Sequence, residues 1–244
     1  PVLRVNKKAT RVMADAAYMK TMGDRLKAFS TLRPKDMFPE RPGVAEPFTG
    51  LTMGEHCELM VKDWGITREA QDHIAANSQA NADAAIKDGR LGAEIVPVAG
   101  VTADDVPRPG TTYEKLSTLK PCFDRSGAGT LTAGNSSALT DGASCVMLMS
   151  EERAKKDGLE IIGYIEDFEL ASVDPNDGLL MAPGVAVPRL LKRNKLDFNK
   201  VDLVEVHEAF AGQVLCNRAA WAQGWKEPAI GEIPDLEERK STLT

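Results

Sequence analysis

The sequence predicts an α/β protein that begins with a mainly helical region. From residue 143 onward, short apolar runs typical of strands alternate with segments of helical spacing, which is the pattern of layered α/β folds. Over residues 1–139 the apolar side chains instead recur at helical spacing or are interrupted by proline and glycine. With 244 residues, 43% of them hydrophobic, the chain is long enough to bury a sizeable core.

The N-terminal segment is basic. Residues 5–32 are predicted to form one or two helices with a break at Met22-Gly23, and residues 33–50, rich in proline and glycine, form an irregular loop. Residues 1–40 carry nine basic side chains against four acidic ones. This excess indicates either a solvated helical face or a basic surface for a partner, an anionic lipid or an acidic cofactor.

Two amphipathic helices are predicted next. Residues 54–64 place four apolar side chains at positions i, i+3, i+4 and i+7, which is the spacing of one helix face. Thr67 is an N-cap residue for a second, alanine-rich helix that runs to Lys87, and Gly89 ends this helix.

The remainder is expected to alternate between strands and helices. Residues 95–123 are rich in loops, and residues 127–133 form a strand or a turn. The segments predicted after these are strands at 143–149, 161–170 and 201–206 and helices at 151–157, 183–193 and 208–223.

Composition excludes several classes of protein. The net charge of −6 argues against general nucleic-acid binding. The four cysteines are far apart, which excludes a CxxC metal or redox motif and indicates a reducing compartment. We predict no metal site, and we expect structural roles for all four: Cys57 and Cys216 on helix faces, Cys122 after a proline, and Cys145 in a buried strand. No run is long enough to span a membrane, and no secretory signal peptide is visible.

The stretch from Leu203 to Ala211 is the most informative part of the chain. An apolar, β-branched run ends in His207-Glu208 and leads into a helix, so both polar groups are expected at the carboxyl end of a strand. The adjacent helix N-terminus favours anions. A histidine satisfied by local hydrogen bonds is the structural alternative.

Small residues mark a second candidate site. Gly134 removes a side chain, and Ala133, Ser136 and Ser137 leave a narrow slot over residues 132–139 that suits a ligand needing close approach to the backbone. An ordinary tight turn is the alternative interpretation.

The order of motifs resembles the thiolase family, most closely the β-oxidation thiolases that form the β-subunit of a trifunctional complex. Each motif is weak alone, but their order and spacing over nearly the whole chain are specific. They are Met53-Gly54, Ser78-Gln79, Asp88-Gly89-Arg90 with Glu94 to Pro97, Leu119 to Pro121 with Phe123-Asp124, Thr132 to Ser137 with Asp141 to Ala143, Leu148 to Glu151, and His207 to Phe210.

The resemblance implies a thiolase-like layered α/β fold. Residues 1–139 would be the mainly helical, CoA-binding loop domain that is inserted into the first α/β half. Residues 140–158 would end that half, and residues 159–244 would begin the second half.

The resemblance also implies an activity, 3-ketoacyl-CoA thiolysis, in which an enzyme cysteine is acylated and the acyl group passes to coenzyme A without a permanent cofactor. His207 stands where many thiolases have an asparagine that holds an oxyanion-hole water, so its ring is expected to contribute to that hole, with Glu208 in support. Arg108 would lie near the adenine nucleotide, unless it is a plain surface residue. The other residues expected to contact coenzyme A are Met53, Ala133, Ser136, Ser137, Leu139, Ala209 and Phe210.

Two family motifs are missing from residues 1–244. The nucleophilic cysteine is expected upstream of Pro1, and a Gly-His-Pro motif with a second cysteine is expected after Thr244. None of the four cysteines matches either position, so we expect the chain to be a truncated form that is inactive alone. The first alternative is a non-catalytic module that binds coenzyme A or a partner, and the second is a purely structural or assembly role.

Partners and location follow from the same resemblance. Acyl-CoA and coenzyme A are the expected ligands, and a homodimer is expected, with a hydratase/dehydrogenase α-subunit as a further partner. Residues 1–40 would touch that partner or an anionic membrane. The expected location is the bacterial cytoplasm or the mitochondrial matrix, not the secretory route, and no nucleic acid is expected.

Overall fold

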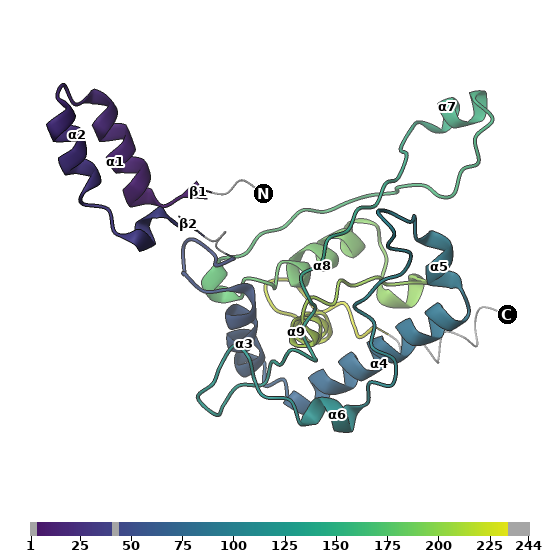
Figure 1. Cartoon of the computed structure of the whole chain (residues 1–244). Helices are drawn as coiled ribbons and strands as arrows, with labels where there is room; N and C mark the ends of the chain where they lie inside the picture. The colour runs from purple at the N-terminus through teal and green to yellow at the C-terminus, as the bar shows by residue number, and fades with distance from the viewer. Residues whose placement is uncertain (1–3, 41–43, 234–244) are drawn as a thin grey trace. The chain divides into compact units, whose positions relative to one another are not determined.

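The structure, a computed structural model, describes residues 4–40 and 44–233, so residues 41–43 of the predicted loop lie outside it. The chain divides after Ala45 into two compact units, which we describe separately as the N-terminal unit and the main unit (Figure 1).

The N-terminal unit is a helical hairpin closed by a short pair of strands. α1 (Lys7–Tyr18) packs against α2 (Met22–Phe29), and β1 (Arg4–Val5) pairs antiparallel with β2 (Pro39–Glu40). The two predicted helices are confirmed, but the predicted break is wrong by a few residues. Met22 is the first residue of α2 because the Thr21 side chain accepts the Asp24 N–H and caps the helix there.

An ion pair ties α1 to the 3-10 helix that follows the hairpin. The Asp36 carboxylate, in the 3-10 helix η1 (Pro34–Met37), accepts the Arg33 N–H at 2.9 Å and the Lys8 ammonium at 3.0 Å. The Arg33 bond first, and the Lys8 contact second, hold the pKa of Asp36 below its ordinary value.

Local sequence signals set the helices of the main unit. Thr67 accepts the Ala70 N–H as the predicted N-cap, and Gly89 takes a left-handed φ of 83° after the helix, as expected. The predicted helix over 183–193 is confirmed. The described helices are α3 (Met53–Asp63), α4 (Arg68–Lys87), α5 (Arg90–Glu94), α6 (Tyr113–Ser117), α7 (Glu151–Lys156), α8 (Pro183–Arg193) and α9 (Ala211–Gln223), with 3-10 turns η2 (Pro175–Asp177) and η3 (Phe198–Lys200).

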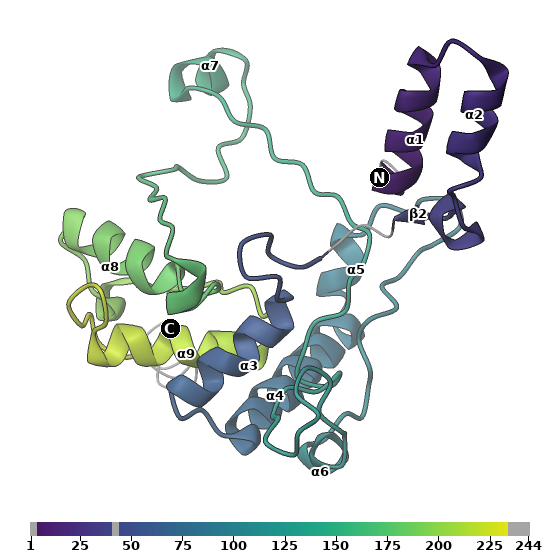
Figure 2. The ribbon, with the colours of Figure 1, turned by 90° about the vertical axis from the view of Figure 1, so that its left-hand side faces the viewer.

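α9 is the central helix of the main unit and packs against α3, α4 and α8 (Figures 1 and 2). The core between these helices includes Cys57, Val61 and Cys216, all nearly inaccessible to solvent. Gly212 allows α3 and α9 to approach closely, because a Cβ at this position would lie 2.5 Å from the Val61 Cγ1 atom. At the other end of α9, the Trp221 indole donates to the Pro183 carbonyl at 3.0 Å.

The three strands predicted after residue 143 do not form in the described residues. None of residues 143–149, 161–170 and 201–206 is assigned to a described strand, and apolar side chains such as Val146 and Ile162 are exposed. Strand conformation is stabilised by hydrogen bonds to an adjacent strand, and the described chain supplies none here. The described structure is therefore mostly helical, and the layered sheets of the predicted α/β fold are not formed in it.

Two further details of the prediction are wrong. Cys145, predicted in a buried strand, is exposed. The helix predicted from Glu208 begins three residues later, at Ala211, because Phe210 stays extended and forms an isolated antiparallel bridge with Ser136.

Candidate functional site

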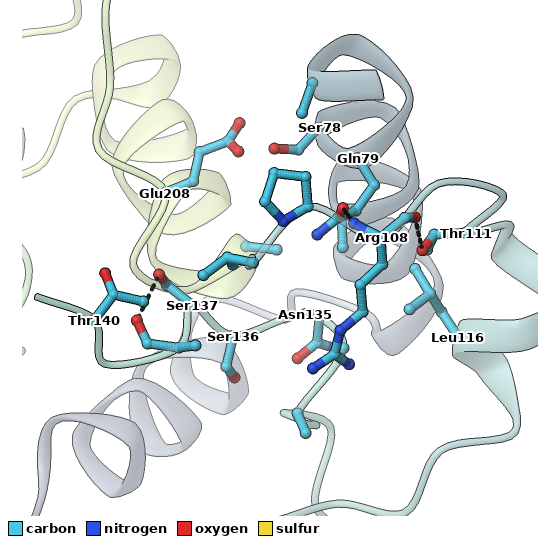
Figure 3. A pocket seen from close by; sticks show the side chains of 18 of the residues that line it. Ser78, Gln79, Arg108, Thr111, Leu116, Asn135, Ser136, Ser137, Thr140 and Glu208 are labelled. Atoms are coloured by element: carbon cyan, nitrogen blue, oxygen red, sulfur yellow. Dashed lines mark hydrogen bonds between the residues drawn. The ribbon is translucent and has the colours of Figure 1, made fainter. Parts of the chain in front are cut away.

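A cleft of about 770 Å³ opens in the main unit between segments that are distant in the sequence (Figure 3). One wall is α4, and a second combines residues 104–111 with α6. Residues 133–142 form a third, and the segment from His207 to Ala211 contributes a fourth.

A buried carboxylate fixes the chain just before the third wall. Glu58, on α3, is only 2% exposed. Its Oε1 atom accepts the Thr130 N–H at 2.7 Å and the Thr130 hydroxyl at 3.0 Å, while Oε2 accepts the Leu131 N–H at 2.9 Å. Because hydrogen bonds to an ionised acceptor are roughly twice as strong as neutral ones, this carboxylate holds residues 130–131 firmly against α3.

The slot predicted over residues 132–139 is built by backbone-directed hydrogen bonds. The buried Asn135 side chain accepts the Thr132 N–H at 2.7 Å and donates to Asp72 on α4 at 2.9 Å. Gly134 allows a close approach here, because a Cβ would lie 2.6 Å from the terminal methyl groups of both Leu116 and Leu119, which would then have to shift. The slot is therefore a close approach of backbone to the α6 wall.

The segment that carries His207 and Glu208 is hydrogen-bonded to this slot. Ala211 donates its N–H to the Asn135 carbonyl at 3.0 Å, and Ser137 donates to the Ala209 carbonyl at 2.8 Å. His207 and Glu208 are exposed on the cleft wall, and the Glu208 side chain points toward the α4 side of the cleft (Figure 3).

Arg108 enters the cleft from the second wall. Its N–H donates to the Gln79 side-chain oxygen at 2.7 Å, and its carbonyl accepts the Thr111 hydroxyl at 2.7 Å. These bonds fix the backbone of Arg108. Its exposed guanidinium lies between Asn135 of the third wall and Leu116 of the second wall (Figure 3). A guanidinium placed this way suits a phosphate group or stacking on a base.

The structure brings most, but not all, of the predicted site residues together. Those that line the cleft are His207, Glu208, Arg108, Ala133, Ser136 and Ser137. Met53 is the first residue of α3 and Leu139 is 88% exposed, and neither lines the cleft. Ala209 contributes its carbonyl to Ser137, while the Phe210 ring packs edge-on against Phe123 with centroids 5.8 Å apart. Contact of any of the predicted site residues with coenzyme A stays a prediction.

Sequence reasoning missed three charged residues that build the site: Glu58, Arg68 and Asp72. Glu58 and Asp72 are buried, and Arg68 pairs with Asp72 at 2.7 Å. One signal was available for Glu58, because it stands beside Cys57 in a helix that was predicted from apolar spacing. A buried acid at such a position implies a specific partner.

The cysteines do not take part in the cleft. Cys57 and Cys216, here named the core thiols, are fully buried as predicted. Burial raises the pKa of both, that of Cys216 to about 12, so neither is a thiolate near neutral pH. Cys122 and Cys145, the surface thiols, are exposed and line no part of the cleft.

Within residues 4–40 and 44–233, no helix combines the length and apolar character needed to cross a membrane. The same residues contain no cluster of three or more His, Cys, Asp or Glu side chains placed to hold a metal ion.

A backbone-lined slot beside a histidine and a guanidinium suits an extended, anionic small molecule. Comparison with known proteins gives the family. The family model described as "Thiolase, N-terminal domain" matches residues 11–152, and "Thiolase, C-terminal domain" matches residues 159–227. The chain belongs to the thiolase family, which confirms the resemblance seen in its motifs.

The relatives support the same assignment. A 3-ketoacyl-CoA thiolase of Klebsiella pneumoniae (strain 342) is 41% identical over 219 residues, which are 87% of this chain and 50% of that protein. One from Escherichia coli (strain K12 / MC4100 / BW2952) is 41% identical over 244 residues, covering 95% of this chain and 56% of that protein. The chain thus spans about half the length of the curated relatives it matches.

A solved structure supports the fold. The Bacillus anthracis acetyl-CoA acetyltransferase matches with a TM-score of 0.66 and 36% identity, covering 72% of this chain and 46% of that protein. The chain therefore has a thiolase-like fold.

Proposed function

We propose that this chain supplies the coenzyme A cleft and the oxyanion-side histidine of a 3-ketoacyl-CoA thiolase, an acyltransferase of fatty-acid β-oxidation. One observation carries the proposal: the slot and the His207 segment line one cleft and are joined backbone to backbone, with Ser137 N to Ala209 O at 2.8 Å. A thioester that entered along the slot would therefore meet the histidine.

In the proposed reaction, a cysteine thiolate attacks the 3-keto carbon and the bond between C2 and C3 breaks. The carbanion left on C2 takes up a proton from a general acid, and acetyl-CoA leaves. The acyl group, now a thioester of the enzyme, passes to the sulfur of a second coenzyme A. A ring N–H of His207 donates to the oxygen on which negative charge develops, and Glu208 supports the segment. Arg108 faces the nucleotide end of coenzyme A, and no permanent cofactor is required.

The nucleophile in this proposal lies outside residues 1–244. The core thiols are buried and protonated near neutral pH, and the surface thiols do not line the cleft. An acyl-transfer nucleophile must be both ionisable and within reach of the thioester, and none of the four meets both conditions.

The test is a thiolysis assay on the protein that carries this segment, with a 3-ketoacyl-CoA and coenzyme A as substrates. Replacing the core thiols with alanine and the surface thiols with serine should leave acetyl-CoA release intact in whatever fraction stays folded. Residues 1–244 alone should release none. Release by this segment, lost on replacing one of its cysteines, would refute the assignment of the nucleophile.

A non-catalytic coenzyme A-binding module is the second candidate, and the absence of a thiol from the lining of this cleft favours it. Calorimetric titration with coenzyme A separates the two functions. Binding that is weakened by Arg108→Ala, in a protein with no thiolysis at all, would support the module.

The three segments predicted as strands fit the same proposal. Residues 143–149, 161–170 and 201–206 would pair with strands from the rest of a thiolase and complete layered α/β halves. Residues 1–139 would then be the loop domain, residues 140–158 the end of the first half and residues 159–244 the start of the second.

The N-terminal hairpin is the proposed partner surface. Tyr18, Met22 and Leu26 are at least 65% exposed, and basic side chains such as Lys20 and Lys27 lie among them. Apolar groups beside cations suit an anionic membrane or a hydratase/dehydrogenase subunit. We also propose a homodimer, and a bacterial cytoplasmic or mitochondrial matrix location.

A further inference from the structure

Three walls of the cleft meet at one buried polar cluster. Asp72, on α4, has a side chain with no exposed surface, and both of its oxygens are used. Oδ2 accepts the Arg68 Nε–H at 2.7 Å, and Oδ1 accepts the Asn135 Nδ2–H at 2.9 Å. A carboxylate removed from water in this way is tolerated only because its lone pairs are satisfied.

Arg68 extends the cluster to the α6 wall. Its Nη2 atom donates to the Leu116 carbonyl at 2.7 Å and to the Leu119 carbonyl at 3.0 Å. Both leucines line the cleft, and both side chains face Gly134 across the slot. The guanidinium therefore sets the distance between α4 and one side of the slot.

Asn135 extends the cluster in the opposite direction. Its side-chain oxygen accepts the Thr132 N–H at 2.7 Å, and its side-chain nitrogen donates to the Thr130 carbonyl at 3.2 Å. These two hydrogen bonds fix the turn that forms the slot. Its backbone carbonyl accepts the Ala211 N–H at 3.0 Å, directly after the His207 segment. A continuous series of hydrogen bonds thus connects the α6 wall, through Asp72, to the start of α9.

We propose that Arg68, Asp72 and Asn135 are positioning residues for this site, which hold the slot and the His207 segment in register. None of the three bears a role in bond making. The proposal rests on the thiolase function proposed above for its kinetic consequence, whereas its structural consequence is independent of that function.

A purely stabilising role predicts something different. Buried ion pairs are weak contributors to stability, since the desolvation of the charges offsets most of their attraction. If the cluster only stabilises the fold, its loss should make the whole main unit open more easily. If it positions the site, its loss should loosen the slot and the His207 segment and leave the rest of the main unit unchanged.

Asp72→Asn is the informative variant because it is isosteric. The amide offers one acceptor oxygen where Arg68 and Asn135 present two donors, so one of the two contacts must be lost. The matched control is Asp83→Asn, which removes a pair with Lys87 at 2.6 Å on the same helix, away from the cleft lining.

The first readout is amide hydrogen exchange of the protein that carries this segment. With Asp72→Asn, exchange should rise about tenfold over residues 130–137 and 207–211 and stay unchanged over α8. Asp83→Asn should change neither. Unchanged exchange at both cleft segments, or an equal rise across α8, would overturn the proposal, and this result stands whether or not the protein is a thiolase.

The second readout is steady-state thiolysis. Asp72→Asn should lower kcat roughly tenfold or more with KM for coenzyme A within about twofold, because small misplacements of catalytic groups cost large factors in rate. Normal kcat in a folded Asp72→Asn enzyme would refute the positioning role, whereas a wild-type protein without thiolysis would refute only the proposed function.

Discussion

Replacing Glu58 with glutamine should lower the free energy of unfolding of the main unit by about 2–3 kcal/mol. The wild-type carboxylate is buried and accepts three hydrogen bonds from Thr130 and Leu131. The amide has a single oxygen, so its NH₂ group must face one of the two backbone N–H donors. An unsatisfied buried donor costs about 1–3 kcal/mol, and the remaining bonds lose the assistance of the charge.

Tryptophan fluorescence during urea unfolding is a suitable assay, because all three tryptophans of the sequence, at positions 64, 221 and 225, belong to the main unit. For a unit of this size, the same change should lower Tm by roughly 4–12 °C. The matched control is Glu69→Gln on α4, where the side chain is 70% exposed and its His73 neighbour lies 3.9 Å away. The control should shift stability by less than about 0.5 kcal/mol.

A Glu58→Gln effect no larger than that of the control would refute the reasoning. It would mean that residues 130–131 do not depend on the carboxylate, and that the slot is held by Asn135 and Asp72 alone.

Three further predictions concern the histidine, the hairpin and the thiols. In the thiolase that carries this segment, His207→Ala should lower kcat roughly 10²–10³-fold with little change in KM. His207→Asn should recover part of the lost kcat. Full kcat in a folded His207→Ala protein would refute the oxyanion proposal. Arg11, Lys20 and Lys27 are exposed on the hairpin, and reversing their charge should weaken sedimentation of the protein with anionic liposomes, more at low salt than at high salt. If sedimentation with liposomes and complex formation with a partner subunit are both unchanged, the basic side chains form only a solvated helix face. Iodoacetamide at pH 8 should modify only the surface thiols of the native chain, and all four cysteines after unfolding. Because burial raises the pKa of Cys216 from 9.0 to about 12, the unfolded thiol ionises first, so the free energy of unfolding should fall as pH rises above about 9, as urea titrations at successive pH values would show.

The candidate site was partly predictable from sequence. The slot over 132–139 and the pair His207-Glu208 were marked by residue types that limit what the backbone can do, and both line the cleft. Glu58 and Asp72 were not singled out, because an acid on a helix is usually solvated and only its neighbours in space show that it is not. Those neighbours lie 72 and 63 positions further along the chain.

Sequence by itself determined the family and most of the longer helices. The start of α4 at Thr67, its end before Gly89 and the extent of α8 depend on interactions within a few residues, so local patterns were sufficient. Tertiary structure decided the strands and the burial of charge. A strand depends on hydrogen bonds to another segment, so the apolar runs at 143–149 and 161–170 form no strand in the described residues and stay exposed. A buried carboxylate likewise depends on donors from distant residues, which only the folded chain brings within reach.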